Sequence, residues 1–175
     1  ELMIEAGQKA RAASRRMAAA STADKNKALL RLAELLEAKK EDIFAANKQD
    51  LVRAKKNGLK ESFVDRLRVT EKVLRLMAEG ARQTAALPDP VGEISEMRRR
   101  PSGIQVGRMR VPLGVLGIIY ESRPNVTVDA ACLAVKSGNA CILRGGSEAF
   151  ETNRILGELV QQALTETGLP TEAVQ

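Results

Sequence analysis

The stretch from Val111 to Asn153, VPLGVLGIIYESRPNVTVDAACLAVKSGNACILRGGSEAFETN, indicates the fold of this chain. Its pattern predicts strand, helix, strand and helix, over residues 114–120, 125–136, 140–143 and 149–167. A polar or glycine-rich break follows each strand. Because parallel strands end at the same edge of a sheet, we expect Glu121–Asn125 and Arg144–Glu148 to lie side by side. Open α/β sheets bind their ligands at this edge, which we call the rim.

The first half of the chain is predicted to be helical. Residues 1–87 carry apolar stripes at helical spacing, so each helix is expected to pack on another element. Ser21, followed three residues later by an aspartate, and Thr70 are the expected N-caps. Gly58 follows a basic last turn and predicts a helix stop.

Residues 91–112 predict a two-stranded β-ribbon. Its strands, 93–99 and 104–111, flank the turn sequence Arg100-Pro101-Ser102-Gly103. Five arginines lie in this ribbon with no acidic residue between them: Arg98, Arg99, Arg100, Arg108 and Arg110. Two interpretations stay open, a solvated or subunit-facing surface and a face that steers anions toward a nearby active site.

The predicted fold class is α/β. We expect a helical segment, a β-ribbon and the first half of a Rossmann-like domain, in residues 1–90, 91–112 and 113–175. Val174 and Gln175 look like the start of a third strand. Because a parallel sheet of two strands is not stable alone, we expect an incomplete chain.

The composition excludes several classes of site. The chain of 175 residues has two cysteines and no histidine, which favours a reducing, cytoplasmic compartment and no metal site. The commonest general base is absent for the same reason. No apolar run approaches the roughly 20 residues of a membrane helix, so no membrane association is expected.

The net charge of +6 indicates an anionic partner. Proteins that bind single-stranded nucleic acid stack bases on clustered aromatic side chains, and only 2% of these residues are aromatic, none of them clustered. A phosphorylated or carboxylated small molecule is therefore expected rather than nucleic acid. A basic RNA-binding protein is the weakest of the interpretations.

The sequence Arg144-Gly145-Gly146-Ser147-Glu148 lies between a predicted strand and a predicted helix. Glycines let a backbone approach a ligand closely, and a helix start offers free N–H groups to an anion. Arg144 has the planar fork that grips phosphate, and Ser147 is expected as the N-cap with Glu148 in the first turn. The alternative is a tight turn with ordinary capping, since neither common phosphate-loop pattern is present.

The other rim loop ends in Arg123, Pro124 and Asn125. Arg123 is a candidate for binding a carboxylate or a phosphoryl group. Asn125 is a candidate amide donor to an oxyanion, and the alternative is that it merely caps the helix that Pro124 begins. Neither cysteine is expected to be a nucleophile, because Cys132 falls on an apolar helix face and Cys141 inside an apolar strand.

The amino-acid sequences of these segments resemble those of one family. The blocks ESRPNVTVD and ILRGGSE carry the resemblance, and ANKQDL near Asn47, VDRL at Val64 and DPVGE at Asp89 extend it over essentially the whole chain. The chain resembles gamma-glutamyl phosphate reductases. The P-x-G-V-x-G-x-I pattern at Pro112 is similar to the wider aldehyde dehydrogenase superfamily.

The resemblance implies NADPH-dependent reduction of L-glutamyl 5-phosphate to L-glutamate 5-semialdehyde, with release of phosphate, in proline biosynthesis. A cysteine of such enzymes attacks the acyl phosphate, and hydride reduces the resulting acyl-enzyme. That cysteine lies downstream in the family, so this polypeptide alone is expected to be inactive. A homo-oligomer is implied, and association with a glutamate 5-kinase is a further expectation. The alternative is a non-catalytic, nucleotide-binding half-Rossmann module.

The resemblance also implies roles for particular residues. Arg144 matches the superfamily lysine that meets the adenosine ribose or its 2′-phosphate, and Ser147 and Glu148 match the S-E of the same block. Gly145, Gly146 and Ser122 complete the expected cofactor-binding set. Asn125 matches the oxyanion asparagine with a local spacing that differs by two residues, and Arg123 is the substrate-binding candidate.

Overall fold

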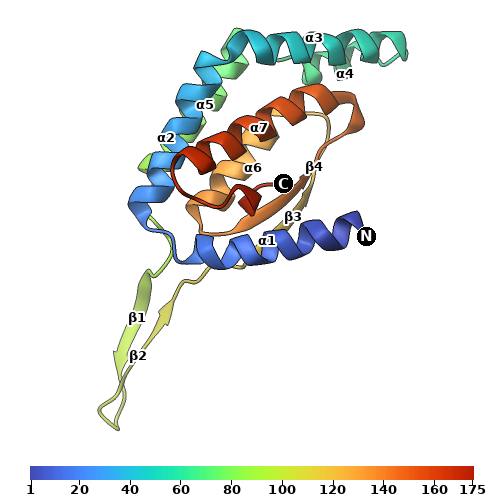
Figure 1. Ribbon diagram of the computed structural model, residues 1–175. Coiled ribbons are helices and arrows are strands. Elements are labelled where there is room, and N and C mark those ends of the chain that lie inside the picture. Colours follow the sequence, from blue (N-terminus) through green and yellow to red (C-terminus); the bar gives the residue numbers. More distant parts are fainter.

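The computed structural model describes residues 1–175, the whole of the printed sequence. Five helices come first, then two strands, and then a unit of alternating strands and helices (Figure 1). The elements are α1 (Leu2–Ala18), α2 (Thr22–Ala38), α3 (Lys40–Lys56), α4 (Glu61–Leu67), α5 (Glu71–Ala86), β1 (Ile94–Arg99), β2 (Gln105–Met109), β3 (Val115–Ile119), α6 (Pro124–Lys136), β4 (Ala140–Arg144), α7 (Phe150–Glu166) and the 3₁₀ turns η1 (Ser147–Ala149) and η2 (Thr171–Ala173).

Local signals decide where the early helices begin and end. The Ser21 Oγ accepts a hydrogen bond from the Asp24 N–H at 3.0 Å, and the Thr70 Oγ1 accepts one from the Val73 N–H at 3.3 Å. Both predicted N-caps are therefore confirmed. Gly58 follows α3 with a φ of +72°, a left-handed conformation that glycine adopts without strain. The predicted helix stop is confirmed as well.

The sheet pairs β3 with β4 in parallel, in the register Ile119 opposite Arg144. The helix α6 crosses over between them, as parallel strands require. Val174 forms a parallel bridge to Cys141, and the Gln175 N–H donates to the Cys141 carbonyl at 3.0 Å. The predicted third strand therefore begins where it was expected.

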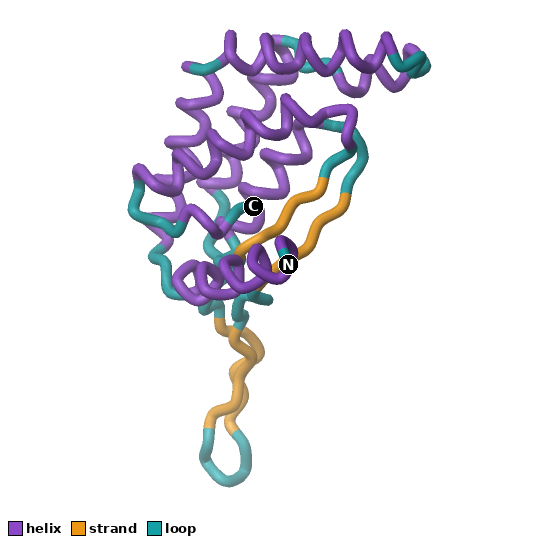
Figure 2. Tube along the Cα trace, turned by 45° about the vertical axis from the view of Figure 1, so that its right-hand side comes forward, coloured by secondary structure: helices purple, strands orange, loops and turns teal.

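One hydrophobic core joins the helical segment to the sheet. Its 31 buried residues run from Ala10 to Val174 and come from α1, α2, α5, α6, α7 and β4, among others. The helices α2 and α5 pack on α6 and α7, while α1 lies against β4 and η2 (Figures 1 and 2). Burial of each large apolar side chain contributes about 1.5–3 kcal/mol, so this core makes the two segments one packed unit.

The antiparallel ribbon of β1 and β2 projects from this body (Figure 1). Every residue of both strands is exposed, and Gly103 closes the turn between them with a φ of +86°. The ribbon leaves the body at Pro112, which lies close to Gly138, just before the start of β4. It is therefore attached at the end of the strands opposite the rim.

Two of the five ribbon arginines are paired with acidic residues of the same ribbon. The Nε of Arg108 lies 3.2 Å from the Glu96 carboxylate, and that of Arg110 lies 3.0 Å from Glu93, because the strand pairing brings these earlier acids alongside. The ribbon also points away from the rim of its own chain. Within one chain, this geometry gives no support to steering of anions toward the rim.

None of the helices combines the length and the apolar character needed to cross a lipid bilayer.

Candidate functional site

The two predicted rim loops lie side by side at the carboxyl ends of β3 and β4. The Tyr120 N–H donates to the Arg144 carbonyl at 3.1 Å, which continues the sheet by one residue into the loops. Beyond it, the Ser122 hydroxyl donates to the Glu148 carboxylate at 2.6 Å. This hydrogen bond, helped by the N–H of Glu148 itself, lowers the pKa of the Glu148 carboxyl. The two loops are thus joined by a charge-assisted bond.

Gly145 and Gly146 are required by close packing. A Cβ on Gly145 would collide with the Asn153 amide and stand 3.2 Å from the Tyr120 ring, and one on Gly146 would collide with the Ser122 hydroxyl. No acceptor of the chain engages the N–H groups of these two glycines. The loop therefore combines free N–H donors with a backbone that a ligand can approach.

A chain of hydrogen bonds supports the loop from below. The Tyr120 hydroxyl lies 2.7 Å from the Thr127 Oγ1, which donates to the Asn153 Oδ1 at 3.0 Å. Burial raises the pKa of Tyr120, against the opposing effect of the bond to Thr127. Because Asn153 lies against Gly145, this network links β3, α6 and α7 beneath the glycines.

The N-terminus of α7 is capped from another helix. The predictions that Ser147 is the N-cap and that the start of this helix offers free N–H groups are therefore wrong. Ser147 makes no capping bond, because a 3₁₀ turn occupies residues 147–149 and α7 begins only at Phe150. Instead the fully buried Asp50 of α3 accepts hydrogen bonds from the N–H of Glu151 at 3.2 Å and the N–H of Thr152 at 2.8 Å. These two N–H groups are consequently not free for an anion.

Asp50 belongs to a buried polar latch that sequence reasoning missed. Asp50 also accepts from the Thr152 hydroxyl at 2.7 Å and from Arg53. Asn47, one turn earlier, donates to the Leu67 carbonyl at 2.8 Å and to Thr152 at 3.2 Å. The available signal was a pair of polar residues on the apolar stripe of α3, since buried polar side chains need designated partners.

The substrate-side candidates lie at the start of α6. Arg123 is exposed at the N-cap position, with its Nε 3.8 Å from the Glu121 carboxylate. The Asn125 amide donates to the Asp129 carboxylate at 3.2 Å and makes no capping bond, so the capping alternative is wrong. Arg66 of α4 also lies 3.6 Å from Glu121, which adds a third exposed arginine beside Arg123 and Arg144.

Arg144 is exposed at the end of β4 and forms no ion pair. With the free N–H groups of Gly145 and Gly146 it makes a cationic, donor-rich edge. This edge has the chemistry needed for a phosphate-bearing dinucleotide such as NAD(P)H, so the residues present fit a cofactor of that kind. No group of three or more acidic or sulfur-bearing side chains could hold a metal ion.

Both cysteines are buried, Cys132 in α6 and Cys141 in β4. Burial raises the pKa of each thiol to about 12, and for Cys132 the charge of Asp129 adds to the effect. A thiol with such a pKa is almost entirely protonated near neutral pH, and the thiolate is the nucleophile. Neither side chain therefore suits nucleophilic attack.

The whole chain, residues 1–175, matches the aldehyde dehydrogenase family. The chain belongs to this family. A gamma-glutamyl phosphate reductase from Thermotoga maritima is 41% identical and superimposes with a TM-score of 0.96 over 100% of this chain. The gamma-glutamyl phosphate reductase from Saccharomyces cerevisiae is 34% identical and superimposes with a TM-score of 0.90 over 98% of this chain. The resemblance and the aldehyde-dehydrogenase-like α/β fold predicted from the sequence are confirmed.

The chain spans less than half the length of these two relatives, 42% of the first and 45% of the second. An NAD-dependent benzaldehyde dehydrogenase from Corynebacterium glutamicum shares the fold, with 24% identity, a TM-score of 0.69 and 97% of this chain covered, over 34% of its own length. The similar structures say nothing of a glutamate 5-kinase, so that association stays a prediction.

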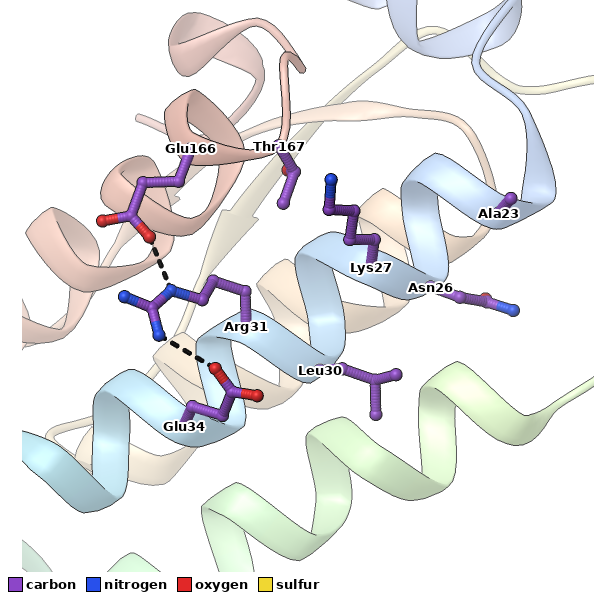
Figure 3. Close-up of a pocket in the computed structure, with 8 residues that line it drawn as sticks. All are labelled: Ala23, Asn26, Lys27, Leu30, Arg31, Glu34, Glu166 and Thr167. Carbon is purple, nitrogen blue, oxygen red and sulfur yellow. Dashed lines mark hydrogen bonds and ion pairs between the residues drawn. The ribbon is translucent and has the colours of Figure 1, made fainter.

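A hollow of about 490 Å³ lies between α2 and the far end of α7 (Figure 3). It is remote from the rim, because the 17 residues of α7 place its two ends about 25 Å apart. Arg31 in this hollow donates to Glu166 at 2.5 Å and to Glu34 at 2.8 Å. These two carboxylates neutralise the charge of Arg31, whose bond to Glu166 joins α2 to α7. The rim therefore remains the better candidate site.

Proposed function

We propose that this chain forms part of an NADPH-dependent reductase that converts L-glutamyl 5-phosphate to L-glutamate 5-semialdehyde and phosphate in proline biosynthesis. The observation that carries the proposal is similarity along the whole chain to two gamma-glutamyl phosphate reductases, at 41% and 34% identity. The rim loops add a chemical argument, because their exposed arginines suit a substrate and a cofactor that both carry phosphate.

The β4 side of the rim is proposed to hold the cofactor. Arg144 would contact the adenosine ribose or its 2′-phosphate, and Gly145 and Gly146 would offer N–H donors at close approach. Ser147 and Glu148 would complete the contact, with Ser122 holding the Glu148 carboxylate in place at 2.6 Å. NADPH supplies the hydride when it is bound.

The β3 side is proposed to hold the acyl phosphate. The Asn125 amide is a neutral donor that can face the acyl oxygen, where negative charge develops as the carbonyl carbon is attacked. Arg123, two residues before Asn125, would bind the phosphoryl group. Because the two cysteines of this chain are buried and protonated, we propose that the nucleophile comes from outside residues 1–175.

The ribbon of β1 and β2 is proposed to be an oligomerisation element. Its exposed apolar side chains include Ile94, Met97, Ile104, Val106 and Met109. A ribbon of two strands is not stable by its own pairing alone, and apolar side chains on it favour burial against another subunit. A homo-oligomer is therefore proposed for the reductase.

The test uses the full-length protein that contains this segment, in the reverse direction. Glutamate 5-semialdehyde and phosphate are supplied with NADP⁺, and the absorbance of NADPH is followed. We expect NADPH formation that depends on phosphate. Binding of NADPH without any turnover would refute the reductase and favour the alternative, a non-catalytic nucleotide-binding module.

A matched pair of variants tests the cofactor contact. Loss of a charged hydrogen bond costs about 1.5–3 kcal/mol, so Arg144→Ala should raise the KM for NADP⁺ about 10- to 100-fold. The KM for NAD⁺ should change little, because that cofactor lacks the 2′-phosphate. The control is Arg15→Ala, which removes an exposed arginine near the end of α1, away from the rim. Equal effects of Arg144→Ala on both cofactors would refute a 2′-phosphate contact.

A further inference from the structure

Asp129 lies one helical turn after Asn125 on α6, and the two side chains are joined by the 3.2 Å hydrogen bond from the Asn125 amide. Helical residues four apart present neighbouring side chains, with Cβ atoms about 5–6 Å from each other. Whatever molecule meets the Asn125 amide therefore also lies within reach of the Asp129 carboxylate.

Asp129 also faces a hollow of about 310 Å³ between α5 and α6. Gln83 and Thr84 of α5 line its other side, and Gly80 stands opposite the carboxylate. A Cβ on Gly80 would stand 3.7 Å from the Asp129 Oδ1, so glycine leaves this side of the carboxylate open. Exposed Leu133 adds an apolar wall. The hollow has room for a small molecule beside the carboxylate.

The carboxylate of Asp129 has no cationic partner. No lysine or arginine lies within ion-pair distance of it, although the chain carries 28 of them. The side chain is exposed toward the hollow, yet neighbouring protein atoms desolvate it enough to raise its pKa, against the opposing bond from Asn125. A partly desolvated carboxylate is stabilised by a bound cation, because the cation compensates for the solvation that the carboxylate has lost.

We propose that Asp129 binds the α-ammonium group of an amino-acid substrate in this hollow while Asn125 faces its acyl oxygen. The inference rests on the proposed function and adds the feature that recognises the amino-acid end of the substrate. Four bonds of about 1.5 Å separate the acyl carbon of a glutamyl group from its α-nitrogen, an extended span of about 5 Å. This span is similar to the separation of about 5–6 Å between the Cβ atoms of residues one helical turn apart.

The inference predicts a specificity that the rest of the rim does not explain. The arginines of the rim recognise negative charge and would treat alike a glutamyl group and the same five-carbon chain without its amino group. A carboxylate without a cationic partner beside the acyl site can distinguish these two molecules. Asp129 is thereby a substrate-binding residue, and it also accepts the Asn125 amide.

The experiment compares two aldehydes in the full-length protein with NADP⁺ and phosphate: glutamate 5-semialdehyde and glutarate semialdehyde, which lacks the amino group. Asp129→Asn keeps the shape of the side chain and removes its charge. We expect the KM for glutamate 5-semialdehyde to rise about 10- to 100-fold, the effect of losing a charged hydrogen bond. The KM for glutarate semialdehyde should change less than about two-fold.

Two further variants keep this test decisive. Asp129→Glu retains the charge and should restore much of the affinity for glutamate 5-semialdehyde. Glu79→Gln removes an exposed carboxylate next to the hollow, whose Oε1 accepts from Gln83 at 3.2 Å, and should leave both KM values unchanged. An Asp129→Asn protein with equal effects on both aldehydes, or with none, overturns the inference, and so does an equal effect of Glu79→Gln. A wild-type protein that turns over neither aldehyde overturns the proposed function itself.

Discussion

Asp50 should be among the most costly polar residues to remove from this chain. It is fully buried and accepts three hydrogen bonds from the first turn of α7, at 3.2, 2.8 and 2.7 Å. Asp50→Ala would leave the N–H groups of Glu151 and Thr152 buried without acceptors. A lost helix cap costs about 0.5–2 kcal/mol, and a hydrogen bond to a charged group about 1.5–3 kcal/mol. Because such losses are not additive, we expect a loss of about 3 kcal/mol in the free energy of unfolding.

The assay is urea and thermal unfolding followed by circular dichroism. For a chain of this size, about 3 kcal/mol corresponds to a fall in Tm of about 6–12 °C. Asp50→Asn keeps one oxygen that can accept, so its loss should be smaller, about 1–2 kcal/mol. The control is Ser21→Ala, which removes the exposed cap of α2 and should cost about 1 kcal/mol. An Asp50→Ala protein no less stable than this control would refute the conclusion that the hydrogen bonds of Asp50 stabilise the start of α7.

Three other outcomes are expected. Gly145→Ala should weaken NADPH binding in a fluorescence titration, because its Cβ would displace the side-chain amide beneath the loop, whereas Gly157→Ala, with open space on α7, should stabilise the chain by about 0.5–1 kcal/mol. The thiols of Cys132 and Cys141 should resist a disulfide reagent near neutral pH until urea unfolds the chain, and labelling of the native protein would contradict their burial. Burial would raise the pKa of Asp89, but its hydrogen bonds have the larger effect and lower it. The ionised carboxylate therefore stabilises the fold above about pH 4, and this contribution is lost as the pH falls further. Asp89→Asn should accordingly reduce the free energy of unfolding above about pH 4 and have no effect at lower pH.

Much of the site could be anticipated because its elements are encoded locally. The apolar segment before Tyr120 and the glycines after Arg144 each mark the end of a strand. The predicted helix between the two strands is the kind of crossover that a parallel pair needs. Two loops at the ends of neighbouring parallel strands must share one edge. The juxtaposition of Ser122 with Glu148 followed from this topology, although the bond between their side chains did not.

The caps show where local reasoning stops. Ser21 and Thr70 cap helices that begin within three residues of them, so the signal and its effect lie in the same short window of sequence. The same reasoning assigned Ser147 to α7 and was wrong. The cap of α7 is Asp50, 102 residues away from the Thr152 it binds. The packing of α3 places Asp50 at the start of α7, where it accepts the hydrogen bonds that a local cap would otherwise accept.

The sequence by itself determined the order of strands and helices, their local caps and the chemistry available at the rim, because periodicity and capping act over a few residues. Only the tertiary structure decided which groups of that rim are free. In the folded chain, two N–H groups of α7 donate to Asp50 and the Asn125 amide donates to Asp129, while Arg144 has no ion-pair partner. These outcomes depend on hydrogen bonds between segments far apart in the chain, and burial decides which of them form.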